Sequence, residues 1–314
     1  MSRAVAAPAG SGRAGRVIGL PRIRGTDEVI GWVLCAPAAV LLGLFLIVPL
    51  VAVSVLAFFG WDPLTQTGHA VGFANFSRIL ASPDLRSAVL RTLEYTVLTV
   101  PVTVVLGLAI AVGINNVRHG AMVWRTVFFL PVASTLAATS VAWRFMFYPQ
   151  TGLVDQTVGR VLPVEGWLQS TDLAVVAVSI VGIWQALGTT VVIFLAGLSG
   201  VPRHLHDAAA LDGATSWSRF WHVTWPALGP ATVLALVIDT RDSLRVFDQV
   251  QVMTEGGPLG STTTLSYLLW QRGIHYNDLG GGAVIDLVIL LVVFAFIGIQ
   301  LKMVGRRLND GAAR

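Results

Sequence analysis

Five charged side chains stand together at the end of a long uncharged stretch. Residues 238–249 read IDTRDSLRVFDQ. The thirteen residues 226–238 carry no charge. The charged residues are Asp239, Arg241, Asp242, Arg245 and Asp248. Guanidinium groups bind phosphate through paired N–H donors, and carboxylates accept hydrogen bonds from hydroxyl groups. The cluster therefore has the chemistry to bind a phosphate ester or a sugar, or to neutralise itself through internal ion pairs.

The spacing of these residues predicts which of them share a helix face. On one continuous helix, Arg241, Arg245 and Asp248 fall within a sector of about 60°, and Asp242 lies three residues before Arg245, within pairing reach. Two arginines on one stripe repel each other unless an acid or a bound anion joins them. We expect Asp239 and Asp242 to hold the arginines, and Arg241 and Arg245 to face a solute. An internal ion-pair network, or arginines reaching to the membrane interface, is the alternative.

The elements that carry this cluster must lie in a membrane. The chain has 314 residues, of which 54% are hydrophobic and 12% charged, whereas soluble domains carry about 25% charged residues. The net charge of +4 comes almost entirely from arginines that are spread between apolar runs, which does not suggest a nucleic-acid partner. The composition predicts an all-α integral membrane protein with membrane lipid around it, since continuous apolar runs are typical of helices rather than barrels.

Six segments are long and apolar enough to cross a bilayer, which takes about 20 helical residues. The third contains Arg144, the fifth contains the charged cluster, and the sixth contains Asp286. Prolines inside or beside the runs predict kinks. The six expected spans lie between 28 and 62, from about 88 to 112, about 123 to 147, between 172 and 203, about 225 to 247, and about 281 to 303.

The basic residues predict the orientation of the chain. With both termini inside, the cytoplasmic segments carry thirteen Arg and Lys residues and the outer segments five, as the positive-inside rule requires. Residues 1–25 lack a signal-peptide pattern and read as a flexible cytoplasmic tail. Residues 26–308 form the expected transmembrane domain, and residues 309–314 a cytoplasmic C-terminal tail.

Several kinds of chemistry have no support in the residues. The sequence contains no G-x-x-x-x-G-K-[ST] phosphate loop, so the chain is not expected to be an ATPase or any other enzyme. His204 and His206 lie two residues apart with no evident third ligand, so we expect no metal site. Cys35 is the single cysteine, and we expect it to be a small packing residue in the first span.

The segment between the fourth and fifth spans carries a recognisable motif. Residues 201–230 read VPRHLHDAAALDGATSWSRFWHVTWPALGP. This segment resembles the signature loop of permease subunits of bacterial binding-protein-dependent ABC importers, which runs Glu-Ala-Ala, three residues, Gly, and later a Leu-Pro pair. Asp replaces the usual Glu at 207, and Trp replaces Leu at 225. The matching residues are Asp207, Ala208, Ala209, Asp212, Gly213, Ala214, Trp225 and Pro226.

The residues of this loop also predict a short helix, rich in Ala and Leu and ended by Gly213. The resemblance implies that loop 201–226 holds a coupling helix that docks on an ATP-binding subunit. It implies the type I ABC importer permease fold, a second homologous permease, a dimer of ATP-binding subunits that carries ATP and Mg²⁺, and an extracytoplasmic solute-binding protein. The location implied is the bacterial cytoplasmic membrane. The coupling residues implied are Asp207, Ala208, Ala209, Leu211, Asp212, Gly213 and Ala214.

Two further segments resemble the carbohydrate-importing branch of that family. They are residues 125–155 and residues 247–274, the second of which contains TEGGPLGSTTTL and is similar to glycerol-3-phosphate importers as well. The function implied is uptake of a sugar, an oligosaccharide or a glycerol-phosphate compound. The expected solute path includes Arg241, Asp242, Arg245 and Asp248, with Trp184 and Gln185 as further candidates or simple packing residues.

Two other functions stay open on the residues alone. An ion-coupled secondary transporter would use Asp239, Asp242 or Asp286 as a proton or sodium site. A membrane-embedded enzyme would use a pair of these acids. Only the importer requires a docking surface for an ATP-binding partner.

Overall fold

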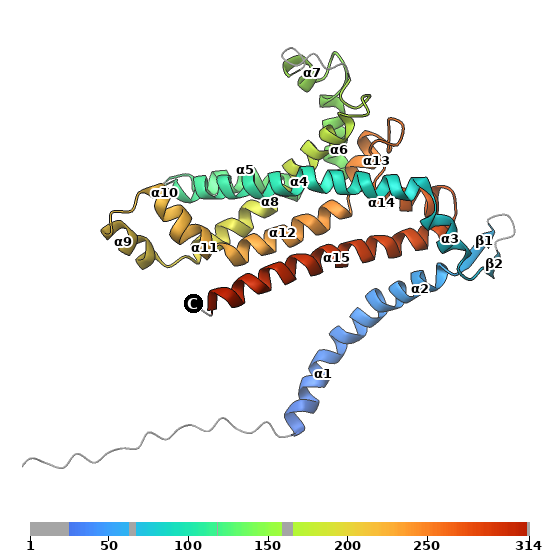
Figure 1. Ribbon diagram of the computed structural model, residues 1–314, viewed down its shortest axis with the longest axis horizontal. Coiled ribbons are helices and arrows are strands. Elements are labelled where there is room, and N and C mark those ends of the chain that lie inside the picture. The colour runs from blue at the N-terminus through green and yellow to red at the C-terminus, as the bar shows by residue number, and fades with distance from the viewer. Residues whose placement is uncertain (1–24, 63–66, 118, 159–165, 313–314) are drawn as a thin grey trace, which may run out of the picture. The chain divides into compact units, whose positions relative to one another are not determined.

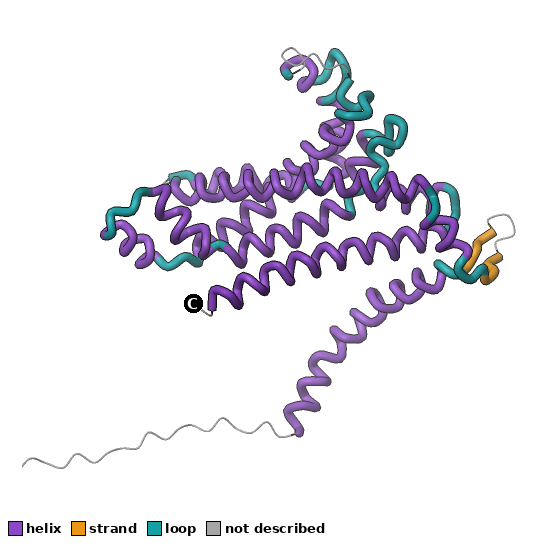
Figure 2. The backbone as a smooth tube through the Cα atoms, in the orientation of Figure 1, coloured by secondary structure: helices purple, strands orange, loops and turns teal. Residues whose placement is uncertain are grey.

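The structure is a computed structural model that describes residues 25–62, 67–117, 119–158 and 166–312. It is almost entirely helical, with one short β-hairpin (Figures 1 and 2). The chain divides into two compact units, Met1–Ala52 and Val53–Arg314. The predicted tail 1–25 lies almost entirely outside the described residues.

The first unit holds the first predicted span. Helix α1 (Gly25–Leu42) continues through a π-helical turn (Gly43–Ile47) into α2 (Val48–Leu56), which runs on into the second unit. Residues 30–56 form an apolar helix long enough to cross a membrane. Cys35 is exposed on α1, so its role as a small packing residue stays a prediction.

The second unit is built from long helices joined by short ones. The hairpin pairs β1 (Phe59–Asp62) with β2 (Thr67–Ala70) in antiparallel register. The helices that follow are α3 (Ala74–Leu80), α4 (Pro83–Asn116), α5 (Ala121–Ala133), α6 (Leu136–Met146), α7 (Leu153–Thr157), α8 (Ala174–Ser199), α9 (Arg203–Leu211), α10 (Ser216–Arg219), α11 (Trp225–Ala227), α12 (Gly229–Leu244), α13 (Asp248–Met253), α14 (Leu265–Trp270) and α15 (Leu279–Ala312).

The predicted spans are present, but two of them are bent. Four apolar helices of sufficient length lie in the first, second, fourth and sixth predicted spans. The third span is divided into α5 and α6, which meet at 98°, and the fifth is divided at Leu228 into two parts that meet at 66°. The kinks expected at prolines in the third and fifth spans are confirmed, and both are sharp enough to divide the span into two helices. Helix α15 continues to Ala312 and includes most of the segment expected to be a tail.

Both bends lie beside prolines. Pro131 is inside the last turn of α5, and the chain at Ser134 and Thr135 is extended before α6 begins. Pro226 starts α11 and Pro230 starts α12, on either side of the break at Leu228. A proline nitrogen cannot donate the helical hydrogen bond, and its ring crowds the preceding turn. The proline positions predicted kinks in these two spans. In the structure each of the two spans is interrupted, so that two separate helices form.

The long helices of the second unit lie side by side, with α8 and α12 against α4 and with α15 beside α12 (Figure 1). Close approach depends on small residues. A Cβ atom added at Gly107 of α4 would lie 2.7 Å from the Cγ2 atom of Thr190 on α8. A Cβ atom at Gly188 would lie 2.7 Å from the carbonyl oxygen of Phe128 on α5. Helices in lipid associate through this kind of close packing.

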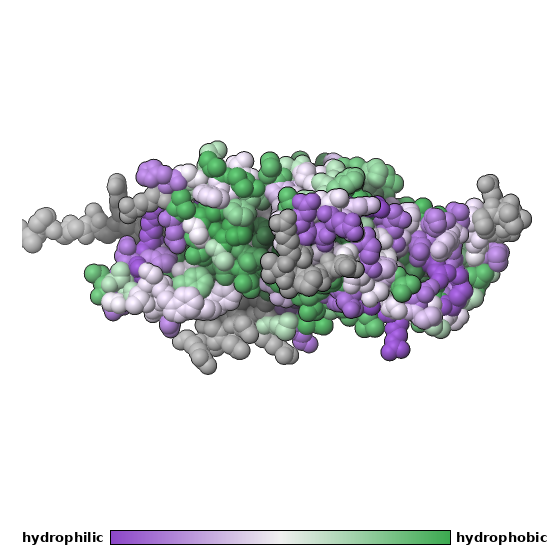
Figure 3. All heavy atoms as spheres, turned by 90° about the horizontal axis from the view of Figure 1, so that it is seen from above, coloured by the Kyte–Doolittle hydropathy of each residue, from purple (hydrophilic) through white to green (hydrophobic). Residues whose placement is uncertain are grey.

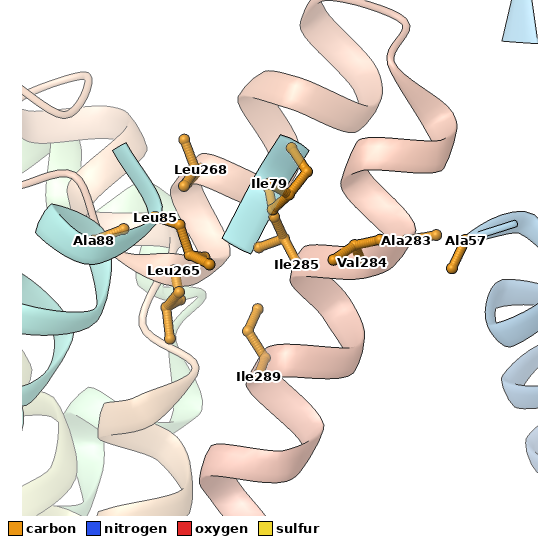
Figure 4. Packing of buried hydrophobic residues seen from close by; sticks show 10 residues of the cluster. All are labelled: Ala57, Ile79, Leu85, Ala88, Leu265, Leu268, Ala283, Val284, Ile285 and Ile289. Atoms are coloured by element: carbon orange, nitrogen blue, oxygen red, sulfur yellow. The ribbon is translucent and has the colours of Figure 1, made fainter. Parts of the chain in front are cut away.

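A buried apolar cluster closes the end of the unit near the hairpin. Figure 4 shows side chains from α3, α4, α14 and α15 meeting there, with Ile79 close to Ile285. An ion pair covers the same junction: Arg78 donates two hydrogen bonds, of 2.7 and 2.9 Å, to the carboxylate of Asp278. Burial raises the pKa of Asp278, but hydrogen bonds from Arg78 and the Gly281 amide, with the charges of Arg78 and Arg272, leave it below its usual range.

Much of the apolar surface stays exposed within the protein chain. Large side chains on the outer faces of the long helices are more than 60% exposed, among them Val97, Val105, Met122, Leu130 and Leu291. Figure 3 shows hydrophobic side chains gathered on one face beside hydrophilic regions. Lipid or another membrane protein must cover such a surface, since soluble monomers rarely expose large apolar patches.

Candidate functional site

A polar stripe runs along the buried face of α4. Thr92, Thr96, Thr99 and Thr103 recur every three or four residues, which puts them on one face of the helix. All four are buried, and the first three donate to the carbonyl four residues earlier at 2.7 to 2.8 Å. These three hydroxyls therefore have acceptors within α4, and the Thr92 hydroxyl also accepts from the Leu265 amide of α14 at 2.9 Å. This threonine spacing is a signal in the sequence that was not used to predict the site.

Helix α12 brings the charged cluster to the threonine stripe. The Ser243 hydroxyl lies 3.0 Å from the Thr99 hydroxyl. Asp239 is buried and accepts hydrogen bonds of 3.0 Å on each carboxylate oxygen from Thr190 of α8. The expectation that Asp239 holds an arginine is therefore wrong, because α8 supplies a nearer donor.

The charged cluster is not one helix. Helix α12 ends at Leu244, Arg245 is its capping residue with φ −110° and ψ 20°, and α13 begins only at Asp248. The predicted stripe of Arg241, Arg245 and Asp248 on one helix face is therefore wrong. The buried Thr264 hydroxyl donates to the Val246 carbonyl at 2.9 Å, so a contact from 18 residues away satisfies the backbone where the helix stops.

The ion pairing also differs from the prediction. The Arg241 Nε atom donates to the Asp242 carboxylate at 2.9 Å, whereas Asp242 was expected to pair with Arg245. Among the described residues, no carboxylate lies within 4.0 Å of the Arg245 guanidinium. Arg245 and Asp248 are both exposed. Arg241 is thus neutralised by the residue that follows it in the chain, whereas the Arg245 guanidinium has no ion pair among the described residues.

These residues surround one cavity of about 580 Å³, which we name the α12 cavity. It brings together five of the six predicted path residues: Arg241, Asp242, Arg245, Asp248 and, from α8, Gln185. The other lining residues come from α4, α5, α6, α8, α12 and α13 and from the turn between α12 and α13. They are Tyr95, Thr99, Thr103, Val132, Leu136, Gly182, Ala186, Thr189, Asp239, Ser243, Val246, Phe247 and Gln249.

Trp184 does not line the α12 cavity. Its ring is half-buried and meets the ring of Trp143 on α6 edge to face, with centroids 5.6 Å apart. The packing alternative fits this position, and the structure gives no support to a solute contact by Trp184.

Two glutamines at the α12 cavity have hydrogen-bonding capacity to spare. Gln249 is 3% exposed, and its amide nitrogen donates to the Tyr95 hydroxyl at 2.7 Å. The buried carbonyl oxygens of Gln249 and Gln185 have no hydrogen-bond partner among the described residues. A buried polar atom without a partner is costly, so these atoms are acceptors that a hydroxyl group in the cavity could satisfy. Neither Gln249 nor Tyr95 was predicted as a site residue.

The proposed coupling segment forms the short helix that its residues predict. Helix α9 ends in a paired turn in which the Gly213 amide donates to the Ala210 carbonyl and the Ala214 amide to the Ala209 carbonyl, at 3.1 and 2.9 Å. Gly213 has φ +76°, a left-handed conformation that glycine adopts without strain. This turn fixes where the helix stops.

Helix α9 leaves its outer face uncovered. Asp207, Ala208, Asp212 and Gly213 are exposed, and the Leu211 side chain is 90% exposed. Ala209 and Ala214 are partly buried. Figure 1 shows α9 and the described C-terminal end of α15 at one end of the second unit, with α3 at the other. A row of small residues beside the exposed Leu211 side chain can accept a partner surface.

Comparison with known proteins defines the class of this protein. Residues 70–310 match the family described as binding-protein-dependent transport system inner membrane component. The chain belongs to this family, and it is therefore a membrane-spanning permease of an ABC importer that works with a binding protein. The prediction from loop 201–226 is confirmed at this level, and no comparison supports the ion-coupled alternative.

Three curated relatives cover almost the whole chain. The sulfoquinovosyl glycerol transport system permease of Agrobacterium fabrum is 30% identical over 88% of this chain and 91% of its own length. The trehalose/maltose permease of Thermococcus litoralis is 29% identical, covering 92% and 98%. The sn-glycerol-3-phosphate permease of Agrobacterium fabrum is 28% identical, covering 91% and 98%.

Solved structures share the fold. A chain of a bacterial ABC transporter that imports the acidic polysaccharide alginate superposes with a TM-score of 0.75 at 21% identity. The match covers 90% of this chain and 98% of that chain. The same kind of transporter bound to a periplasmic protein carrying an alginate pentasaccharide gives a TM-score of 0.73 at 19% identity. The fold prediction is confirmed.

Proposed function

We propose that this permease forms, with a second homologous permease, the translocation path for a sugar, an oligosaccharide or a glycerol-phosphate compound. The relatives named above transport solutes of these kinds. The α12 cavity is the observation that carries the proposal, because it gathers charged and hydroxyl side chains among membrane helices. Charges inside a span cost about 2.5 kcal/mol or more each at the bilayer centre and normally face a polar path.

The side chains around the α12 cavity suit a solute with hydroxyl groups. The Arg245 guanidinium pairs with no carboxylate of the described segments, and a guanidinium donates to hydroxyl or phosphate oxygens. Asp248 and the unpartnered carbonyl oxygens of Gln185 and Gln249 accept hydrogen bonds from hydroxyls. Arg241 and Asp242 neutralise each other and can still bind through their remaining donors and acceptors. Together these groups can replace the water that a sugar loses on entering the membrane.

Transport is driven, in this proposal, by a separate dimer of ATP-binding subunits. The chain has no phosphate-loop motif of its own, so ATP and Mg²⁺ bind on the partner and this chain forms no covalent intermediate. Helix α9 docks on that partner through Ala208, Ala209 and Leu211. Closure of the ATP-binding dimer then moves α9 and, through loop 201–226, the start of the fifth span.

The outer side receives the solute-binding protein. The loop between α13 and α14 is ordered by its threonines: the Thr254 and Thr262 hydroxyls lie 2.8 Å apart, and the Thr263 hydroxyl donates to the Gly256 carbonyl at 3.1 Å. This loop exposes 97% of Leu259 at its tip. Under the proposed orientation, with both termini in the cytoplasm, Leu259 faces the binding protein.

Uptake into vesicles tests the energy source. Vesicles containing the assembled transporter, its binding protein and labelled candidate sugars or glycerol 3-phosphate should accumulate a solute only with ATP on the cytoplasmic side. A proton-gradient uncoupler should leave the initial rate unchanged. Uptake that follows an imposed proton or sodium gradient without ATP would favour ion-coupled transport by the intramembrane acids.

Substitutions on α9 test the coupling role. Ala208→Glu adds a bulky charge where close approach is needed, and Gly213→Pro removes the amide that closes the end of α9. Both variants should insert normally but lose copurification with the ATP-binding subunit or lose ATP-driven uptake. His204→Ala, on the exposed first turn of the same helix, is the control. Normal copurification and uptake by both variants would refute docking through α9.

A further inference from the structure

Arg245 lies between two cavities. It lines the α12 cavity, and it also lines a second cavity of about 290 Å³, which we name the α15 cavity. Phe247 is shared in the same way. As the capping residue of α12, Arg245 sits where the backbone leaves the helix, so its long side chain extends from a turn and can reach either cavity by rotating about its own bonds.

Asp286 lines the α15 cavity together with Arg245. It lies in the membrane-spanning part of α15 and is half-buried. Apart from Arg245, Asp286 and Ser266, the cavity is lined by Phe247, Leu269, Trp270, Ile274 and Ile289. Arg245 is the charged group that acts on the Asp286 carboxyl among the described residues. Neither side chain has an ion pair within 4.0 Å there.

An acid and a base in one mostly apolar cavity attract each other strongly, because the surrounding medium screens them poorly. An unpaired charge within a span is costly, so the nearest opposite charge becomes its counter-charge. Asp239 accepts from Thr190 and Asp242 pairs with Arg241. Asp248 lines the α12 cavity but not the α15 cavity. Asp286 is therefore the acid on α15 that can balance Arg245, whereas a ligand in the α12 cavity would draw the same guanidinium the other way.

We propose that Asp286 is a positioning residue for Arg245, drawing its guanidinium toward α15 when the α12 cavity holds no solute. Its consequence for transport rests on the proposed function of the α12 cavity: a solute must compete with Asp286 for Arg245, which links solute binding to the position of α15. The electrostatic pairing itself does not depend on that function.

The pairing is measurable with charged thiol reagents. In the assembled transporter carrying Cys35→Ser, Arg245→Cys is exposed to a methanethiosulfonate reagent bearing an ammonium group and to one bearing a sulfonate group. The field of Asp286 should make the cationic reagent react faster. Adding Asp286→Asn should lower the ratio of the two rates by about fivefold or more. The ratio is the readout because a change in thiolate fraction alters both rates equally.

Two companion variants keep the test decisive. Asp286→Glu retains the charge and should retain the ratio, which a purely structural role of Asp286 does not predict. Glu94→Gln, at an exposed pair with Arg91 on α4, should leave the ratio unchanged. An unchanged ratio in Asp286→Asn, with normal membrane levels, would overturn the pairing. A fall in the ratio together with solute uptake that is insensitive to Arg245→Ala would instead overturn the role of the α12 cavity.

Discussion

At the residue scale, the site depends on which partner each charged side chain meets. Asp239 accepts from Thr190, Arg241 pairs with its neighbour Asp242, and Arg245 stays unpaired beside the α12 cavity. A threonine stripe on α4 and two glutamines complete a surface of donors and acceptors. The hydrogen bonds from Thr190 to Asp239 join α8 to α12, and the Arg245 guanidinium remains available to a solute.

The two arginines should differ in their effect on uptake. Arg245→Ala should lower uptake by about tenfold or more, because a hydrogen-bonded charged contact contributes about 1.5–3 kcal/mol. Arg241→Ala should have the smaller effect, since Asp242 already satisfies part of Arg241. Initial uptake rates in vesicles measure both, with Arg86→Ala on the exposed side of α4 as the control. Uptake unchanged by Arg245→Ala, with assembly intact, would favour a purely internal charge network.

The clamp between Arg78 and Asp278 should make stability depend on pH. The pKa of Asp278 is lowered in the folded protein, so its contribution is present above the unfolded pKa of about 3.9 and is lost as the pH falls through the folded pKa. Asp278→Asn should lower stability by about 1 kcal/mol or less at pH 7, since Arg78 is half-exposed. The difference from the unchanged protein should shrink below about pH 4.

Thermal unfolding in detergent across this pH range measures that difference. Glu94→Gln, which breaks an exposed pair within one helix, serves as the control and should change stability by a few tenths of a kcal/mol. A difference for Asp278→Asn that stays constant from pH 7 to pH 3 would contradict the role of the carboxylate charge.

At the element scale, close helix packing and helix breaks position the α12 cavity. The bend between α5 and α6 puts Val132 and Leu136 at one wall, and the end of α12 at Leu244 puts Arg245 in a turn. Neither arrangement exists in straight spans. Pro131 marked the first region in the sequence, but no proline marks the end of α12, where the Thr264 hydroxyl donates to the Val246 carbonyl.

Gly188 tests the packing of α8 on α5. A Cβ atom at Gly188 would lie 2.5 Å from the Val132 Cγ2 atom, so Gly188→Val should destabilise the protein by about 1–3 kcal/mol through overpacking. Gly113→Val on α4 is the matched control, because no atom lies within 4 Å of its added Cβ. Thermal unfolding of the purified variants should show a clear drop for Gly188→Val only. An equal loss of thermal stability in both variants would mean that the helix propensity of valine, rather than a steric clash at Gly188, causes the destabilisation.

At the scale of the whole molecule, function requires other chains. The α12 cavity is formed by this permease alone but opens on its surface, and α9 has an uncovered face. The family is defined by dependence on a binding protein. The two faces that should meet partners, the Leu259 loop and α9, lie outside the apolar spans, as a transporter that receives solute on one side and energy on the other requires.

The orientation of the chain is testable with impermeant thiol reagents. In a Cys35→Ser background, Leu259→Cys should react in intact cells, and His204→Cys should react only in inverted vesicles. The physical reason is the excess of arginine in the segments assigned to the cytoplasm. Labelling of both positions from the same side would contradict the six-span arrangement, and reversed labelling would contradict the assignment of the termini.

The sequence by itself determined that this chain lies in a membrane and approximately where its apolar spans lie. It also contained the segment 201–226, which resembles the signature loop of importer permeases. These properties follow from hydrophobic length and from motifs that are local in the chain. It also located the charged residues of the α12 cavity, because charge inside an apolar run needs no tertiary contact to be noticed.

Only the tertiary structure decided which charges pair. Helical spacing predicted Asp242 with Arg245 and Asp239 with an arginine, and both were wrong because α12 ends at Leu244 and because Thr190 approaches from α8. Asp286 meets the field of Arg245 from 41 residues away in the sequence. Where a helix stops, and what faces its last turn, depends on hydrogen bonds and packing from distant segments, which no local pattern encodes.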